Sequence, residues 1–544
     1  MGRGLTELFD YLQEVDNLKN SFSRTESDIV EKLTEKPDEA TEIFQNSLRL
    51  AWIQHIEALH PILRSVSSLK MQQMEDELQE SVLQKQTLSQ EIVLLKLREQ
   101  TYKGLLINRL QNVVTYRELH HQTTKKRKLW SVRKVLEAYS EELFKLIPCW
   151  MASPESVSAM FEMKENLFDL VIFDEASQCF AEYGIPAIFR GKQVVVAGDS
   201  KQLQPNDLYQ IRYEEDVSDE PILEIDSLLD LAAQYLPQAS LMGHYRSQSL
   251  DLIGFSNQFF YKNSLRLLPH YEQISRNEPA INYIKVEGIW EENTNEREAQ
   301  KVVDLVAELQ QISPEKSIGV VTFNHKQAEL IELRAVRRCD TNYERFAAAI
   351  RIKFSLNAQI SVKNIENIQG DEFDIVIFSV GYAPDANGRL LMNFGTLNQT
   401  GGENRLNVAV TRAREKIYVV SSILPNQLNV ENAQNEGPKM LKKYLEYALA
   451  ISNGEFLHEP TLPESFRTDW FLKEQLKKRN SQYISELPFA DVTVKAENGK
   501  SESLILTDDD LYFDGISPKE SHAYLPMNLR AKGWKFERFW SRNF

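Results

Sequence analysis

The chain has few cysteines and no long apolar runs. Its three cysteines, Cys149, Cys179 and Cys339, are widely spaced and offer neither a disulfide framework nor a cluster of zinc ligands. No apolar stretch approaches the length needed to cross a bilayer, and the N-terminus lacks the apolar core of a signal peptide. The sequence therefore predicts a reduced, cytoplasmic location and no membrane partner.

Positive charge is also scarce. The chain carries 63 Lys and Arg residues against 79 Asp and Glu residues, which gives a formal net charge of −16 at pH 7. This balance argues against indiscriminate binding of nucleic acid, but it is compatible with a local basic groove. Otherwise the composition is that of a globular protein, and 544 residues suffice for about two to four domains.

Glycine and proline are absent from residues 63–103, which are rich in Leu, Gln, Glu and Lys. This composition predicts a long helix or a helical hairpin. The apolar positions keep a heptad repeat only loosely, so we interpret the segment as a stalk and not as a coiled coil. Residues 1–145 as a whole predict a helical spacer.

A continuous apolar run ends in two carboxylates. Residues 168–173 read Phe-Asp-Leu-Val-Ile-Phe, and Asp174 and Glu175 follow directly. Such a run predicts a strand buried on both faces of a parallel sheet, and the ligands of such sheets gather at the carboxyl ends of the strands. Asp174 would then hold the Mg²⁺ ion of a nucleotide, and Glu175 would activate a water. The alternative is a buried strand that simply ends in an Asp-Glu turn.

Five further blocks follow in order, at 198–205, 243–247, 319–324, 368–374 and 405–414. With these blocks the chain resembles the superfamily 1 helicases, specifically their DNA2/NAM7-like branch. The resemblance covers roughly residues 145–425. It implies an α/β fold with two RecA-like parallel-sheet lobes, and an ATP- and Mg²⁺-dependent helicase or translocase that acts on DNA or, alternatively, on RNA. The helical spacer would be the insertion that precedes the first lobe's Asp-Glu strand in this family.

The resemblance also assigns roles to single residues. Gln202 would sense the γ-phosphate, and Arg246 and Arg412 would be arginine fingers, each worth about 10³–10⁵ in rate. Gly370 would allow close backbone approach, and Glu372 would contact the nucleotide sugar or the opposing lobe. The nucleotide site would thus comprise Asp174, Glu175, Asp199, Gln202, Arg246, Gly370, Glu372 and Arg412.

Three segments are candidates for contact with nucleic acid. Residues 125–134 are rich in Lys and Arg and contain Arg127 and Trp130, so a solvated helix face and a nucleic-acid contact both remain open. Residues 148–157 fit a strand that ends in a Ser-Pro turn. The remaining candidates rest on the resemblance, which would place Ser153, Ser156, Thr322 and Gln327 near the nucleic acid.

The C-terminal residues resemble the restriction-endonuclease-like domain attached to certain bacterial helicases of this branch. A helix is predicted at 468–480, and strands are predicted at 489–494 and 504–508. Asp491 and Asp508 would be the carboxylates that hold a metal ion. The acidic-x-Lys step expected after the second strand is absent. An inactive DNA-binding remnant and an active nuclease are therefore both open.

The predicted organisation has five parts. They are a helical insertion (1–145), a first RecA-like lobe (146–280), a second lobe (281–437), a helical linker (438–465) and a restriction-endonuclease-like domain (466–544).

A glycine-rich loop ending in Gly-Lys-Thr/Ser, which would cradle the phosphates, is not found in a suitable place. The tripeptide Gly499-Lys500-Ser501 lies in the wrong domain. We therefore expect a C-terminal part of a longer or split helicase, whose loop an N-terminal chain would supply. This chain alone would hydrolyse ATP weakly or not at all. The rival hypotheses are a nucleic-acid-binding scaffold without ATP hydrolysis, and a nuclease positioned by a degenerate motor.

Overall fold

The computed structural model describes residues 2–35, 37–65, 67–106, 114–205, 227–276, 278–338, 360–455, 468, 470–485, 487–515 and 517–544. The chain divides into two compact units, Met1–Lys85 and Gln86–Phe544. Helix α5 (Ser68–Lys103) contains the boundary between the two units.

The first unit is built from helices, as its composition predicts. A capping box starts α2, because the Ser23 side chain accepts the Glu26 N–H group while the Glu26 carboxylate accepts the Ser23 N–H group. None of the helices described here or below combines the length and the apolar character needed to cross a membrane. Before α5 come α1 (Gly2–Ser21), α2 (Arg24–Leu33), α3 (Ala40–Leu59) and α4 (Ile62–Ser65).

The second unit begins with helices around a short parallel strand pair. Strands β1 (Val171–Phe173) and β2 (Val194–Val196) pair in parallel, with Val171 opposite Val194. Helices α8 (Pro154–Met160), α9 (Ala181–Phe189) and α10 (Leu228–Tyr235) share an apolar cluster with these strands. Helices α6 (Arg117–Thr124) and α7 (Val132–Leu146) belong to a second cluster.

The prediction that the first of these strands is buried on both faces is wrong. The side chain of Ile172 is 63% exposed and that of Val195 is 49% exposed. Within the described residues, β1 and β2 pair only with each other, and no layer covers the face that carries these two side chains. The apolar run forms the strand, but burial of its second face needs partners that a run of sequence does not specify.

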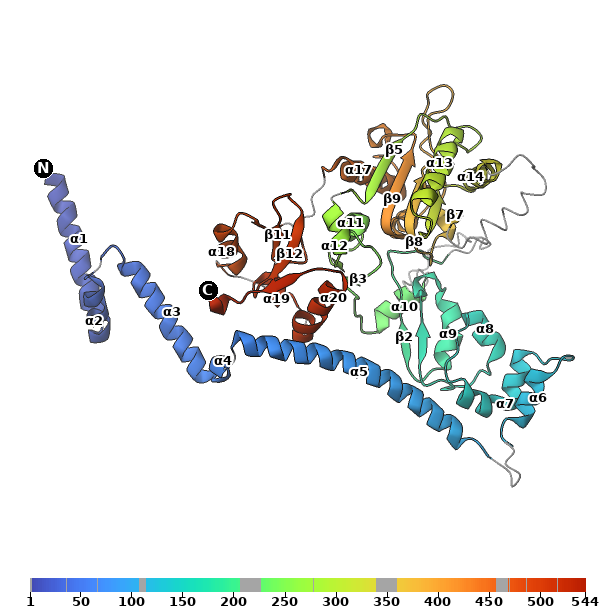
Figure 1. The fold of residues 1–544 in the computed structure, drawn as a ribbon, viewed down its shortest axis with the longest axis horizontal. Helices are drawn as coiled ribbons and strands as arrows, with labels where there is room; N and C mark the ends of the chain where they lie inside the picture. The colour runs from blue at the N-terminus through green and yellow to red at the C-terminus, as the bar shows by residue number, and fades with distance from the viewer. Residues whose placement is uncertain are drawn as a thin grey trace, which may run out of the picture. The chain divides into compact units, whose positions relative to one another are not determined.

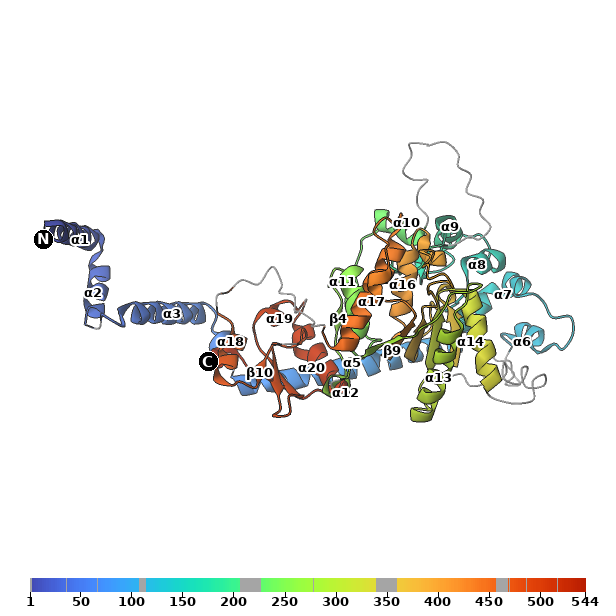
Figure 2. The same cartoon turned by 90° about the horizontal axis from the view of Figure 1, so that it is seen from above.

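A five-stranded sheet forms the centre of the second unit. Its strand order is β5-β9-β8-β6-β7, and every neighbouring pair is parallel. Figure 2 shows α16 and α17 on one side of these strands and α13 and α14 on the other. A parallel sheet covered by helices on both faces agrees with the predicted α/β class and with a RecA-like lobe. The strands are β5 (Ile281–Lys285), β6 (Ile318–Thr322), β7 (Ile360–Asn364), β8 (Phe373–Ser379) and β9 (Ala413–Ser421).

The helices of this lobe start where their sequences indicate. The Asn295 side chain accepts the Glu298 N–H group and so caps α13, whose apolar face then packs on the sheet. The covering helices are α11 (Leu250–Phe259), α13 (Glu296–Ile312), α14 (His325–Arg338), α16 (Gly402–Val410) and α17 (Glu436–Asn453) (Figure 1).

Helix α11 belongs to the core of this second lobe. Leu252, Phe255 and Phe260 are buried in the same apolar cluster as Val321 and Phe378 of the sheet. The predicted lobe boundary at residue 280 cuts through this cluster, so we place the start of the second lobe before α11. Strand β3 (Gly243–His244) precedes α11, and β4 (Arg266–Leu267) and α12 (Tyr271–Arg276) follow it.

The C-terminal module has a four-stranded mixed sheet that packs on the segment around α11 and α12. Leu504 and Trp534 share an apolar cluster with Ile253 and Leu267, and Trp534 Nε1 donates a hydrogen bond of 2.8 Å to the Pro269 carbonyl. The elements are α18 (Leu472–Arg479), β10 (Tyr483–Ile484), β11 (Val492–Lys495), β12 (Ser501–Leu506), α19 (Asp510–Phe513), α20 (Leu525–Ala531) and β13 (Phe536–Arg538).

A buried carboxylate ties the first turn of α13 to the strand ends. One oxygen of Glu298 accepts hydrogen bonds from Ser379 Oγ (2.9 Å) and from the Gly381 N–H group (2.5 Å). The other oxygen accepts from Ser422 Oγ (3.2 Å) and Asn295 Nδ2 (3.4 Å). Burial raises the pKa of Glu298 to about 7, although these hydrogen bonds act in the opposite direction.

The raised pKa of Glu298 predicts a pH-dependent stability. The folded chain binds this proton more tightly than the unfolded chain does, so stability should fall as pH rises from about 4.5 to 7 and stay lower above. The lost free energy of unfolding is about 3 kcal/mol. In Glu298→Gln the pH dependence that comes from Glu298 should vanish. Midpoints of urea unfolding between pH 5 and 8, compared for the two proteins, would measure this difference. The same slope in both proteins would contradict the assignment.

Candidate active site

Asp174 and Glu175 follow β1 directly and are both exposed. Glu175 has φ 53° and ψ 41°, a left-handed conformation that is uncommon outside glycine and tends to occur at functional sites. Its N–H group donates a 3.0 Å hydrogen bond to Asp174 Oδ1. This sharp turn sends two adjacent carboxylates out from the end of the strand.

Glu175 meets a residue of the second lobe. Gln369, which lies just before β8, donates a 3.1 Å hydrogen bond from Nε2 to Glu175 Oε2. The two residues are 194 positions apart in sequence. The carboxylate predicted to activate water therefore contacts the block at 368–374, and the two blocks meet where the lobes contact each other.

The loop after β2 is organised by Asp199. Its Oδ2 atom accepts hydrogen bonds from Gln202 Nε2 (3.1 Å) and from the Tyr261 hydroxyl (2.6 Å), and its Oδ1 atom accepts the Lys201 N–H group at 2.8 Å. Burial, and then the charge of Asp199, raise the pKa of Tyr261 well above its usual value, so the hydroxyl stays a proton donor. The Gln202 side chain is thus held in place by the aspartate.

Helix α16 holds this loop from the opposite lobe. The buried Asn407 donates hydrogen bonds from Nδ2 to the Lys201 carbonyl (2.7 Å) and to the Tyr261 hydroxyl oxygen (3.1 Å). Asn404 donates to the Ser200 carbonyl at 3.4 Å. The sequence analysis missed these residues. Asn407 lies within the block at 405–414 and could have been suspected, whereas Tyr261 carries no local signal.

Arg246 lies in an ion-pair cluster. Its Nε atom is 2.9 Å from Glu372 Oε1, and its Nη1 atom donates to the Thr411 carbonyl at 3.4 Å. Glu372 Oε2 also accepts from Arg414 Nη2 at 2.6 Å. Burial raises the pKa of Glu372, but the hydrogen bonds from Arg414 and Arg246 outweigh it, so the net pKa lies below the usual value. Glu372 thus contacts Arg414 of its own lobe and Arg246, which precedes the second lobe in the sequence.

Arg412 is almost fully buried at the end of α16. Its Nε atom donates to the Val408 carbonyl (2.7 Å) and its Nη2 atom to Thr411 Oγ1 (3.2 Å). Burial, followed by the charge of Arg246, lowers its pKa to about 10, while the charges of Glu175 and Glu372 act in the opposite direction. Arg412 therefore stays protonated at neutral pH within the electrostatic field of both carboxylates.

Gly370 has φ +83°, which other residues rarely adopt, but a Cβ atom there would meet nothing within 4 Å. The structure therefore explains this glycine by its backbone conformation. The close backbone approach expected from the resemblance stays a prediction.

Asp174 suits the Mg²⁺ ion that the resemblance implies. The ion commonly binds through one or two carboxylates while it keeps several waters and contacts phosphate. One oxygen of the exposed Asp174 accepts the Glu175 N–H group, and the carboxylate remains accessible beside it. Among the described residues, no group of three or more His, Cys, Asp or Glu side chains could hold a metal ion without such added ligands.

Two predicted nucleic-acid contacts differ from the structure. Thr322 and Gln327 are completely buried in the second lobe. Gln327 accepts the Asn295 N–H group at 2.8 Å and donates to Ser379 Oγ at 3.2 Å, and the Thr322 hydroxyl donates to the Asn324 carbonyl at 2.8 Å. Their polar groups are satisfied inside the protein, so neither faces a surface as the prediction requires.

Ser153 and Ser156 lie at the start of α8. The Ser153 side chain accepts the Ser156 N–H group at 3.3 Å and so caps the helix. The strand predicted before this turn is not formed, because residues 147–153 have no regular structure and Trp150 instead packs edge-on against Phe161, with ring centroids 5.3 Å apart. Contact of the two serines with phosphate stays a prediction.

The aromatic residue of the basic segment 125–134, Trp130, contacts other side chains of the protein. Trp130 stacks with Tyr139 at a centroid distance of 6.3 Å, and the ammonium groups of Lys134 and Lys125 lie 4.5 and 5.5 Å from its ring centroid. Arg127 is exposed. The structure thus leaves Arg127 available to nucleic acid, whereas Trp130 is already occupied by cation–π and stacking contacts.

The two proposed nuclease carboxylates do not converge. Asp508 accepts the Ser541 N–H group (2.8 Å) and its hydroxyl (2.6 Å), whereas Asp491 is buried and accepts the Thr507 N–H group (2.8 Å). Burial raises the pKa of Asp491 to about 7, and its Oδ1 atom has no hydrogen-bond partner. This arrangement does not support the predicted metal pair.

A lysine that the sequence analysis missed neutralises this region. Lys473 Nζ lies 2.6 Å from Asp510 Oδ1, and both side chains are largely buried. Asp509 accepts the N–H groups of Leu472 (2.9 Å) and Lys473 (2.8 Å) at the start of α18. The ion pair and this cap together attach α18 to the end of β12.

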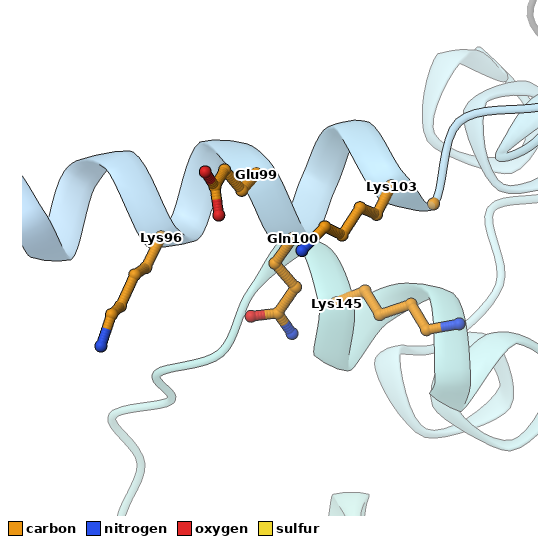
Figure 3. Close-up of a pocket in the computed structure, with 6 residues that line it drawn as sticks. Lys96, Glu99, Gln100, Lys103 and Lys145 are labelled. Atoms are coloured by element: carbon orange, nitrogen blue, oxygen red, sulfur yellow. The ribbon is translucent and has the colours of Figure 1, made fainter.

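The structure also has an open pocket of about 520 Å³ where α5 and α7 end (Figure 3). In Figure 3 the ends of Lys96 and Lys145 point away from each other. None of the candidate residues lines it. Its lining consists of Lys96, Glu99, Gln100, Lys103, Gly104 and Lys145.

Comparison with known proteins agrees with the resemblance. Two family models, each described as an AAA domain, match residues 23–206 and 226–423. An uncharacterized ATP-dependent helicase of Mycoplasma pneumoniae is 36% identical over 327 residues, which cover 58% of this chain and 28% of that protein. One from Methanocaldococcus jannaschii is 26% identical over 302 residues, which cover 51% of this chain and 39% of that protein.

The chain spans less than a third of the length of the Mycoplasma relative. Among solved structures, the PRRSV helicase matches 46% of this chain and 34% of its own, at 16% identity and a TM-score of 0.21. The assignment of the second lobe to the α/β class comes from its parallel strand order. The family and relative matches support a helicase-type protein.

Proposed function

We propose that this chain forms the cleft of an ATP-dependent nucleic-acid helicase or translocase of superfamily 1. The observation that carries the proposal is the contact between Glu175 and Gln369, which joins motifs from two lobes. The hydrogen bonds from Asn407 to the Lys201 carbonyl and from the Tyr261 hydroxyl to Asp199 join the same lobes a second time. Movement of either lobe would therefore alter both the Glu175 and the Gln202 positions.

Each side chain has a chemical role in this proposal. Asp174 would hold the Mg²⁺ ion, whose charge would stabilise the phosphates of bound ATP. Glu175 accepts a proton from the attacking water, and Gln202 contacts the terminal phosphate. Arg246 and Arg412 supply positive charge to the transferring phosphoryl group. Closing of the cleft around ATP and its opening after hydrolysis would move the lobes along a strand held across them.

The glycine-rich phosphate loop is proposed to come from outside this sequence, either from a preceding segment of a longer chain or from a second chain. We also propose DNA as the substrate, with RNA as the alternative. Ser153, Ser156 and Arg127 are the described residues proposed to contact its backbone, because all three lie outside the buried core. The exposed guanidinium of Arg127 is suited to phosphate.

Substitution of Glu175 tests the proposed chemistry. Glu175→Gln should lower ATP hydrolysis stimulated by single-stranded DNA by about 10²–10⁴-fold, since the amide cannot accept the proton. The assay combines this chain with a chain that carries the phosphate loop. Glu182→Gln, at an exposed position of α9, is the matched control and should keep full activity. Equal rates for Glu175→Gln and the wild type would refute the role.

The scaffold hypothesis is favoured by one observation, the absence of a suitably placed Gly-Lys-Thr/Ser sequence in this chain. It predicts binding of single-stranded DNA without hydrolysis under every condition of the same assay. The nuclease hypothesis has no comparable support, because Asp491 and Asp508 have separate partners.

A further inference from the structure

Glu372 is held between two arginines. One carboxylate oxygen pairs with Arg246 Nε at 2.9 Å, and the other pairs with Arg414 through Nη2 at 2.6 Å and Nε at 3.1 Å. Arg414 also lies 3.8 Å from Asp374 Oδ1. The Arg246 and Glu372 side chains are only 18% and 23% exposed, so their pairing is screened less by solvent than a surface ion pair.

This arrangement occupies the arginine that the proposed reaction needs. A guanidinium that pairs with a carboxylate through Nε cannot present the same edge to a phosphate. If Arg246 moved away, the partly buried Glu372 carboxylate would lose one of its counter-ions. Leaving a buried charge less well compensated is costly. Arg414 removes that cost, because it already contacts the other oxygen of Glu372.

We propose that Glu372 is the resting partner of Arg246, and that Arg414 is a positioning residue that allows Arg246 to exchange from Glu372 to an incoming phosphoanion. This inference rests on the proposed function. Arg414 keeps the Glu372 charge compensated during the exchange and does not itself touch the anion. Glu372 thus sets how readily the arginine is released.

Binding of inorganic pyrophosphate, measured by titration calorimetry on the full chain, tests the exchange. Arg246→Gln should abolish binding. Glu372→Gln should bind about fivefold more tightly than the wild type, since the competing carboxylate charge is gone. Arg414→Gln should bind about fivefold more weakly, since Glu372 then depends on Arg246 alone.

The double variant separates this role from a structural one. In Glu372→Gln with Arg414→Gln, affinity should match Glu372→Gln alone, because Arg414 acts only through Glu372. Weakening that persists in the double variant, or a loss of affinity in Glu372→Gln, would overturn the exchange, as would binding that is undetectable in every variant. Thermal unfolding of each variant checks that it folds.

The outcome is independent of the proposed hydrolysis. If the predicted order of pyrophosphate affinities is found while hydrolysis does not depend on Glu175, the exchange stands and the proposed function fails. If hydrolysis depends on Glu175 while the affinities do not follow the order, the proposed function stands and the exchange fails.

Discussion

Replacing Arg412 with alanine is expected to lower DNA-stimulated ATP hydrolysis by about 10³–10⁵-fold, the size of an arginine finger's effect. The guanidinium is buried and fixed by hydrogen bonds to Val408 and Thr411, so little reorganisation is needed when phosphoryl charge develops beside it. The steady-state rate at saturating ATP, with the loop-bearing chain and single-stranded DNA present, measures the effect.

Arg412→Lys separates charge from geometry. Lysine keeps a positive charge but loses the planar fork, so most of the rate should still be lost. Binding of single-stranded DNA should survive in both variants, which shows that the lobe has folded. If Arg412→Ala hydrolyses ATP at more than about a tenth of the wild-type rate, Arg412 does not stabilise the transferring phosphoryl group.

Replacing Lys473 with methionine is expected to destabilise the C-terminal module by about 3–5 kcal/mol, because it leaves the buried Asp510 without its counter-ion. Repulsion among the nearby carboxylates adds to this cost, because the pKa of Asp491 is already raised by burial and by the charges of Asp510 and Asp509. Hydrogen exchange of the full chain, compared at β11 and β12, measures the loss where it occurs.

Lys477→Met is the matched control on the same helix. Lys477 pairs with Glu474 at 2.6 Å, but this pair is more exposed, at 27% and 48% of the side chains, so its loss should cost less than about 1 kcal/mol. Similar protection of β11 and β12 in wild type and Lys473→Met would show that the Lys473–Asp510 pair does not stabilise the module.

The sequence predicted the strands that border two of the blocks, because apolar runs are local signals. Glu175 follows β1 and Gln369 precedes β8, although the hydrogen bond that joins these two residues was not predicted. The Asn295 cap of α13 was likewise readable, because its signal is local.

Features that depend on distant partners were not readable from sequence. The periodicity of α11 shows an apolar face, but not that Leu252 and Phe255 pack on the second lobe's sheet. The amide of Gln327 could form hydrogen bonds either with solvent at a surface or with a buried network. In the structure it bonds to the backbone of Asn295 inside the protein. Tyr261 and Lys473 lack any sequence signal because their partners, Asp199 and Asp510, are remote in the chain.

The most direct test of the composite cleft is ATP hydrolysis by the wild-type chain, alone and with a chain that carries a Gly-Lys-Thr/Ser loop, each with and without single-stranded DNA. The predicted result is little or no turnover by this chain alone, and turnover that rises with DNA when the loop-bearing chain is present. DNA binding without hydrolysis in the complete mixture would contradict the composite cleft and leave Asp174 and Glu175 without a catalytic role.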